Sequence, residues 1–270
     1  MVNGPGPSGR YYHTVTLVGS KLFVFGGKIG KTALNDMWAL DLNTRTVAHC
    51  RSEPFSSDSS AVKLQPFWVS YEASPENEKP LPRASHVSVT TEGRIIMSVP
   101  LISSLSPLVI ILHRFGGSDS RHDYNDTWSF DISTRKWTEL KCTGSIPSPR
   151  SGHAAVLIDD VVYVFGGFTM DKTYLDDLNA LQLSSECFRM LKVYITFVQM
   201  RNAAQRWFKL QNVGPNPHRR SCHTMAFDGT RIFLLGGWPK GAQADEISLI
   251  HVLDTSMYNL FVISSGQLRG

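Results

Sequence analysis

The sequence has little cysteine and no concentrated charge. Its cysteines form no closely spaced pair of the kind that binds a metal, so we expect free thiols of a reducing compartment; they are Cys50, Cys142, Cys187 and Cys222. The formal net charge of +4 is mild and the basic residues are scattered, which argues against a nucleic-acid-binding surface. The first ten residues contain Gly and Pro but no apolar core, so we expect no signal peptide and a cytoplasmic protein.

Long hydrophobic runs are also nearly absent. The exception is residues 95–112, which are eighteen uncharged residues and lie near the lower limit for a membrane-spanning helix. This run holds two prolines and four serines and interrupts a strand of the repeat described below. We therefore expect a surface excursion there and no insertion into a membrane.

What the sequence does contain is one pattern that occurs four times. Each copy has an Arg, a His three residues later, and an apolar segment that ends in two glycines. The interval from His to the first Gly is thirteen residues in copies one, three and four and thirty in copy two. A Trp or Leu follows the first Gly by twelve residues in copies one to three. Self-similarity at fixed spacing indicates a repeat architecture; the copies are Arg10-His13-Gly26-Gly27-Trp38, Arg83-His86-Gly116-Gly117-Trp128, Arg150-His153-Gly166-Gly167-Leu178 and Arg220-His223-Gly236-Gly237.

Each copy predicts four short strands. Residues 153–158 and 161–165 are apolar, and Asp159-Asp160 between them has the length of a hairpin loop. Residues 126–131 and 136–140 supply the third and fourth strands in copy two. One such sheet cannot bury both faces, whereas radially arranged sheets cover one another. We therefore predict an all-β propeller with four four-stranded blades over residues 8–73, 81–146, 148–212 and 217–264; the alternative is a β-sandwich with regularly spaced turns.

The paired glycines and spaced aromatic residues resemble the kelch repeat, a propeller blade of about this length. The stretches that carry the resemblance are also similar to the fungal Tea and Kel cell-polarity group; they are residues 6–13, 79–89, 124–128, 147–155 and 250–254. That group places a kelch propeller before long coiled coils, and the chain has no heptads, so only the propeller part is matched. The resemblance implies a protein-interaction scaffold linked to the cytoskeleton at the cell cortex or cell tip.

Kelch propellers commonly have about five to seven blades. The four copies therefore form either a four-bladed disc or part of a larger ring. In the second case a terminal blade without a neighbour would be open to self-association.

Three segments break the period of the repeat: residues 49–64, 97–113 and 186–205. They differ in composition from their flanks, and removing them restores the spacing. We therefore interpret them as retained introns that have been translated, and we expect a chain without residues 97–113 to be more stable.

The four arginines are expected on the same face of the disc as the Gly-Gly loops, because the first strand begins where the second ends. A ring of forked donors there would bind carboxylates or phosphates of a protein partner. The alternative is an internal salt bridge from each Arg to Asp36, Asp126 or Asp176, which lie ten residues past the first Gly. Phe168 and Trp238 directly follow the glycine pairs and are expected to be exposed contact anchors.

Other repeated residues are expected to be structural. The histidines of the repeat are too widely separated around a ring to share one metal ion, so we expect no metal and no cofactor. The aromatic residues are expected in the core between blades; they are Trp38, Trp128, Trp137, Trp207, Tyr12 and Tyr163.

An enzyme on the same fold, of the galactose-oxidase-like or isomerase-like kind, is the alternative function. The copper site of galactose oxidase needs Tyr and His ligands with a Cys-linked Tyr, a set that we cannot match here. Residues 26–32 fall one residue short of a phosphate-binding P-loop. We therefore expect a non-enzymatic scaffold.

Overall fold

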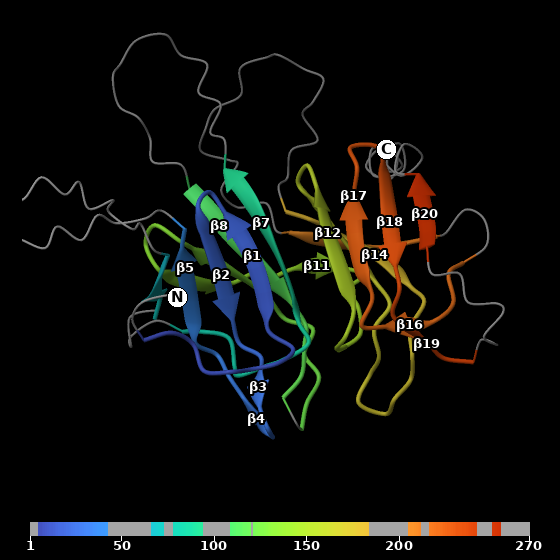
Figure 1. Ribbon diagram of the computed structural model, residues 1–270. Helices are drawn as coiled ribbons and strands as arrows, with labels where there is room; N and C mark the ends of the chain where they lie inside the picture. The colour runs from blue at the N-terminus through green and yellow to red at the C-terminus, as the bar shows by residue number, and fades with distance from the viewer. Residues whose placement is uncertain are drawn as a thin grey trace, which may run out of the picture.

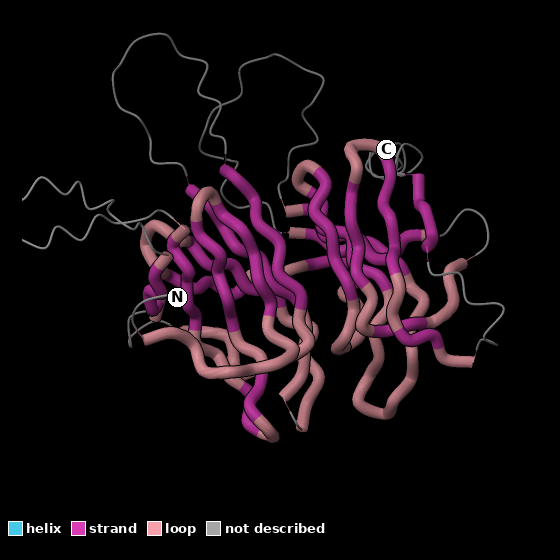
Figure 2. The backbone as a smooth tube through the Cα atoms, in the orientation of Figure 1, coloured by secondary structure: helices cyan, strands magenta, loops and turns pink. Residues whose placement is uncertain are grey.

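The computed structural model describes residues 5–42, 66–72, 78–93, 109–119, 121–183, 205–211, 216–241 and 250–254. All regular secondary structure in these residues is β-strand, and four main sheets follow one another in chain order (Figures 1 and 2). The predicted all-β propeller with four blades is confirmed.

The first two blades are four-stranded antiparallel sheets. Blade 1 has the spatial order β1-β2-β5-β6, from Thr14–Val18, Lys21–Phe25, Met37–Asp41 and Phe67–Ser70. A small ribbon of β3 (Lys28–Ile29) and β4 (Thr32–Ala33) extends its Gly-Gly loop. Blade 2 has the order β7-β8-β9-β10, from Val87–Gly93, Val109–Phe115, Thr127–Asp131 and Lys136–Glu139.

Blades 3 and 4 repeat the same plan with one difference each. Blade 3 contains β12 to β15, from Ala154–Ile158, Val161–Phe165, Leu178–Gln182 and Arg206–Leu210. The short strand β11 (Thr143–Gly144) pairs in parallel with β15, so these two residues belong to blade 3 although they precede the expected boundary. Blade 4 shows three strands in the described residues, β17 (Thr224–Phe227), β18 (Arg231–Leu235) and β20 (Ile250–Asp254).

The paired glycines allow neighbouring blades to approach closely. Gly166 and Gly167 have φ values of +64° and +92°, which side chains rarely tolerate. The Gly167 N–H donates to the Arg220 carbonyl of the next blade at 2.9 Å. A Cβ on Gly166 would lie 2.8 Å from the same oxygen, so this position requires glycine.

The core lies between the blades. Phe23, Phe25 and Met37 of blade 1 pack with Trp128 and Phe130 of blade 2. The remaining clusters join blade 2 to blade 3 around Trp207 and blade 3 to blade 4 around Phe165. Tryptophans 128, 137 and 207 are buried as expected.

Two aromatic residues expected in the core lie elsewhere. Tyr12 is 52% exposed, and Trp38 is only half-buried. Both belong to blade 1, which has no blade before it in the described residues to cover them.

One of the expected inserts overlaps a strand of blade 2. Residues 49–64 and almost all of 186–205 fall outside the described residues, as do 97–108. Residues 109–113, however, belong to strand β8, which pairs with β7 and β9. The expected insert and strand β8 overlap because the apolar run ends in residues that can themselves form the second strand of blade 2.

Candidate functional site

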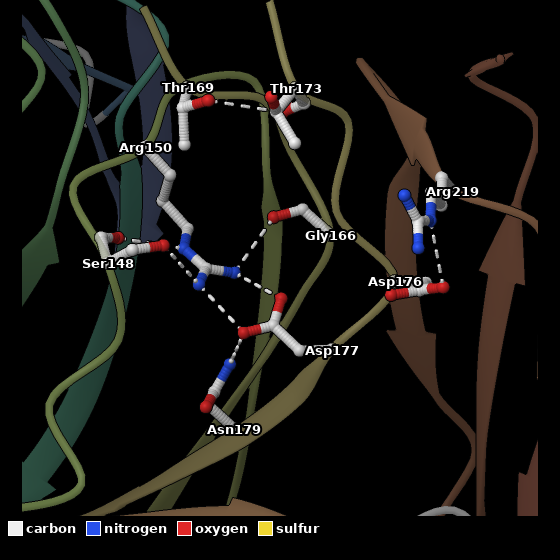
Figure 3. A network of polar contacts seen from close by, with 9 residues as sticks. All are labelled: Ser148, Arg150, Gly166, Thr169, Thr173, Asp176, Asp177, Asn179 and Arg219. Carbon is white, nitrogen blue, oxygen red and sulfur yellow. Dashed lines mark hydrogen bonds and ion pairs between the residues drawn. The ribbon is translucent and has the colours of Figure 1, made fainter. Parts of the chain in front are cut away.

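The arginines of the repeat anchor the loops that form one rim of the propeller. In blade 3, Arg150 donates from Nη1 and Nη2 to the two carboxylate oxygens of Asp177, at 2.7 and 2.8 Å (Figure 3). Its Nη1 also donates to the Gly166 carbonyl at 3.1 Å, and its Nε donates to the Ser148 carbonyl. A single side chain therefore ties the linker before the first strand to the Gly-Gly loop after the second.

Blades 1 and 2 contain the same arrangement. Arg10 binds Asp36 and the Gly26 carbonyl, while Arg83 binds Asp126 and the Gly116 carbonyl. The predicted salt bridges to Asp36 and Asp126 are thus present. In blade 4, Arg220 donates to the Gly236 carbonyl at 2.9 Å.

In blade 3 the acidic partner is Asp177 rather than the expected Asp176. The connection between β13 and β14 is one residue longer than its equivalents in blades 1 and 2, because Phe165 pairs with Leu178, whereas Phe25 pairs with Met37 and Phe115 pairs with Thr127. Asp176 forms a separate, exposed pair with Arg219 at 3.2 Å (Figure 3).

Because of the same extra residue, Leu178 is not the structural equivalent of Trp38 and Trp128. Trp38 Nε1 donates to Asp36 at 2.9 Å, and Trp128 Nε1 donates to Asp126 at 2.7 Å. In blade 3 the corresponding bond comes from the Asn179 amide to Asp177, at 2.9 Å. Asn179 therefore occupies the position that the spacing gave to Leu178.

The arginines do not form the exposed ring of donors expected at the rim. The side chains of Arg10, Arg83 and Arg150 are 4%, 1% and 1% exposed, and Arg220 is fully buried. Their donors bind groups within the protein, among them the Asp partners of Arg10, Arg83 and Arg150. Burial alone would raise the pKa of Asp177, but the Arg150 guanidinium and Asn179 amide hold that pKa below its usual value.

A hollow of about 470 Å³ lies on this rim between blades 3 and 4. Phe168 stacks on Tyr174 with ring centroids 5.8 Å apart and forms one wall. Trp238, in the short strand β19 (Trp238–Pro239), forms the other wall and is 72% exposed. Both residues expected as contact anchors therefore line one depression, which we call the rim hollow; its lining is Phe168, Lys172, Tyr174, Trp238, Pro239 and Lys240.

Two lysines give the rim hollow a positive edge. Lys240 Nζ lies 5.3 Å from the Tyr174 ring centroid and donates to the Lys172 carbonyl at 3.2 Å. This contact joins the loop of blade 4 to the loop of blade 3. Sequence reasoning missed the lysines and Tyr174, although Tyr174 and Tyr124 both lie eight residues past the first Gly.

The comparison with known families decides the identity of the fold. The KLHDC2/KLHL20/DRC7 Kelch-repeats domain matches residues 110–265, and the Kelch motif matches residues 9–51. The chain belongs to the kelch-repeat family. Residue 110 lies within β8, so the longer match begins in blade 2 of the kelch propeller and reaches past β20.

Three relatives show how widely this kelch propeller is shared. Tip elongation aberrant protein 1 of Schizosaccharomyces pombe is 31% identical over 99% of the chain, which spans 19% of that protein. Acyl-CoA-binding domain-containing protein 5 of Arabidopsis thaliana is 25% identical over 98% of the chain and 41% of its own length. Host cell factor 1 of Homo sapiens is 26% identical over 87% of the chain and 10% of its own length. The chain thus spans less than half of each of these relatives.

The histidines of the kelch repeat lie at the interfaces between blades. His86 packs edge-on against Phe25 of the preceding blade, and His153 does the same against Phe115. Burial, and after it the charge of the nearby Arg150, lower the pKa of His153 to about 3, although the hydrogen bond to the Phe115 carbonyl acts in the opposite direction. These histidines therefore pack the blades together, and no group of three possible metal-ligating side chains occurs among the described residues.

The described residues also contain no helix with the length and apolar composition needed to cross a membrane. Residues 109–112 of the uncharged run are in strand β8.

Proposed function

We propose that this kelch propeller is a protein-binding scaffold that docks its partner in the rim hollow. The observation that carries the proposal is the exposure of Trp238 beside the stacked Phe168 and Tyr174. Large aromatic residues on a rigid scaffold are favoured as interaction hot spots. The buried Arg–Asp pairs beneath the loops supply the rigidity.

The chemistry of the hollow favours an acidic segment with an apolar side chain. The aromatic walls accept the apolar group, and the ammonium groups of Lys172 and Lys240 attract carboxylates at the edge. Among the described residues, no acidic side chain lines the hollow. Binding should therefore weaken as salt screens the two lysines.

The propeller is further proposed to act in cell polarity at the cortex or cell tip. The support is the relative named for tip elongation, whose likeness extends over 99% of the chain. The identity of the partner and the place in the cell where the propeller acts are parts of the same proposal.

The rim hollow can be tested by affinity capture followed by titration of the recovered partner against purified variants. Trp238→Ala should weaken binding at least about tenfold, which corresponds to about 1.4 kcal/mol. Trp238 is the sharper test because Phe168 is half-buried and its truncation would also disturb the loop.

The matched control is Leu42→Ala on the opposite rim. Leu42 is 41% exposed, and its N–H bonds to Ser20 in the β1–β2 hairpin, at the other end of the blade. This variant should bind normally, as should Asp160→Ala in the corresponding hairpin of blade 3. If Leu42→Ala lost the partner while Trp238→Ala retained it, the partner would bind on the opposite rim and the proposal for the rim hollow would be wrong.

A further inference from the structure

Three interfaces between consecutive blades use one set of backbone hydrogen bonds. The second glycine of each blade donates to the carbonyl of the next blade's Arg at 2.9 Å, from Gly27 to Arg83, Gly117 to Arg150 and Gly167 to Arg220. The residue two past each Arg donates to its counterpart in the preceding blade, from Ser85 to Tyr12, Gly152 to Ser85 and Cys222 to Gly152. The interface is therefore a repeated socket and plug: Gly-Gly is the socket, and Arg-x-x-His is the plug.

Blade 4 presents a socket that no plug fills among the described residues. A Cβ on Gly26, Gly116 or Gly166 would meet the next blade's backbone within 3.0 Å, but one on Gly236 would meet nothing within 4 Å. Gly236 and Gly237 nevertheless keep φ values of +65° and +89°, as in the filled sockets. The socket is thus preformed.

Blade 1 presents the complementary unfilled plug. His86, His153 and His223 are 5–8% exposed beneath a Phe of the preceding blade, whereas His13 is exposed. The inner strands β1, β7, β12 and β17 lie side by side in that order, and no such packing joins β17 back to β1 in the described structure (Figure 1).

The apolar surfaces beside socket and plug are uncovered as well. Val15 and Leu17 of β1 are 53% and 58% exposed, whereas Ala155 and Leu157, their counterparts in β12, pack against the preceding blade. Val252 of β20 is 53% exposed, although Ala39 and Ala180 at the same register in blades 1 and 3 are almost fully buried.

We propose that these two surfaces bind each other between two copies of the chain, so that blade 1 of one copy docks on blade 4 of the other. The Gly237 N–H would donate to the partner copy's Arg10 carbonyl, and the partner's Tyr12 N–H would donate to the Cys222 carbonyl. The occupant is a second copy because its Arg10-x-x-His13 segment has the motif that fills the other three sockets. Val15 and Leu17 would then cover Val252.

The contact joins two different surfaces, so it is head-to-tail, and it ends only where a ring closes. Two copies with four blades each give eight blades, within the range of about four to eight that propellers use. Each copy would then use both of its open blades once. The inference is independent of the rim hollow.

Light scattering with size-exclusion chromatography tests the proposal over a wide range of protein concentration. The unmodified chain should have twice the mass of one copy. Leu17→Asp on blade 1 and Val252→Asp on blade 4 should each be monomeric, with circular dichroism showing that the strands persist. Leu81→Asp is the matched control, because Leu81 is 59% exposed but lies on neither open blade; it should remain dimeric.

Mixing the two monomeric variants is the decisive step. One intact blade 4 and one intact blade 1 remain in the mixture, so a one-to-one complex should form that neither variant gives alone. Monomeric behaviour of the unmodified chain at all concentrations would overturn the proposal. It would also be overturned if only one of the two Asp variants lost association, since a symmetric contact through a single blade would then be responsible.

Discussion

Arg150 and Asp177 form a two-point ion pair across 27 residues of sequence, with nitrogen–oxygen distances of 2.7 and 2.8 Å. Arg150 is fully buried, while the Asp177 side chain is 18% exposed. The pair closes the blade at the rim, because Arg150 also holds the Gly166 carbonyl. The pair therefore stabilises the blade and lies beneath the surface that we propose to bind a partner.

We predict that Asp177→Asn lowers the free energy of unfolding by about 3 kcal/mol, because it leaves a buried guanidinium without its charge partner. Asp176→Asn provides the neighbouring control. Its Arg219 partner is 59% exposed, so the loss should be at most about 1 kcal/mol. Urea denaturation measures both, and equal losses would contradict the assignment of Asp177 as the structural carboxylate.

The glycine pairs provide a second prediction. Comparing the equivalent positions Gly166 and Gly236 separates the cost of a strained backbone from the cost of a steric clash with the next blade. Gly166 and Gly236 have nearly equal φ values of +64° and +65°, but only Gly166 faces the next blade. Ala at either position should cost about 1–3 kcal/mol for the left-handed backbone. Gly166→Ala should cost more, because its Cβ would lie 2.8 Å from the Arg220 carbonyl oxygen.

Thermal melts of both variants in the Leu17→Asp background would measure this difference without any contribution from association. Equal destabilisation would show that the blades adjust to the added methyl group. A larger loss for Gly236→Ala would contradict the inter-blade contact.

The fold could be predicted from the sequence because the fixed intervals reflect fixed strand lengths. The thirteen residues from His to the first Gly span one hairpin, β12 and β13 in blade 3, and the interval repeats wherever that hairpin does. Tyr163 and Trp207 are buried, as expected for aromatic residues of the core between blades.

The rim could not be predicted in the same detail. The extra residue before β14 shifts Asp177 into the place expected for Asp176, and a single interval of twelve gave no sign of it. The rim hollow is formed by loops of two blades, so Lys172 and Lys240 meet only after the blades have packed.

The buried histidines predict a loss of stability in acid. The folded-state pKa is about 3 for His153 and about 4 for His223, mainly because burial disfavours the charged ring. The unfolded chain, with a histidine pKa of about 6.5, binds more protons between these values. Stability should therefore fall as the pH drops from about 6.5 to 4, by about 1.4 kcal/mol per pH unit for each such histidine.

Replacing His153 with Gln should remove one histidine's share of that slope. The variant is expected to be less stable at pH 7, since the ring packs on Phe115, but its stability should depend less on pH. Urea midpoints between pH 4 and pH 7 provide the measurement. An unchanged slope would contradict the burial of a neutral ring at this position.

Strand β8 contains a charged residue, Arg114, that lies in the apolar core. Arg114 is 3% exposed, its Nε and Nη1 have no hydrogen-bond partner in the described structure, and its guanidinium lies over the Phe25 ring at 3.3 Å. Burial, and then the charge of Arg83, lower the pKa of Arg114 well below its usual value. The equivalent residues at the same register, Val24 and Val164, are apolar.

The burial of Arg114 indicates which residues should be deleted to obtain a more stable, shortened chain. Removing seventeen residues restores the interval of thirteen between His86 and Gly116. Removing 97–113, as first expected, keeps Arg114 in the core, whereas removing 98–114 places Met97 there, after Ile95 and Ile96. We therefore predict that deletion of 98–114 stabilises the protein and that deletion of 97–113 gives a smaller gain or none.

Thermal melts of the two deletions and of Arg114→Met in the full chain test this directly. Arg114→Met should raise the free energy of unfolding by about 1–3 kcal/mol, because desolvating an unpaired charge costs several kcal/mol, which exceeds the roughly 2 kcal/mol of a desolvated cation–π contact. Arg83→Met is the control and should be destabilising, since Arg83 binds both oxygens of Asp126. If Arg114→Met lowered the melting temperature, the stacking on Phe25 would outweigh the buried charge, and residues 109–114 would be the proper second strand of blade 2.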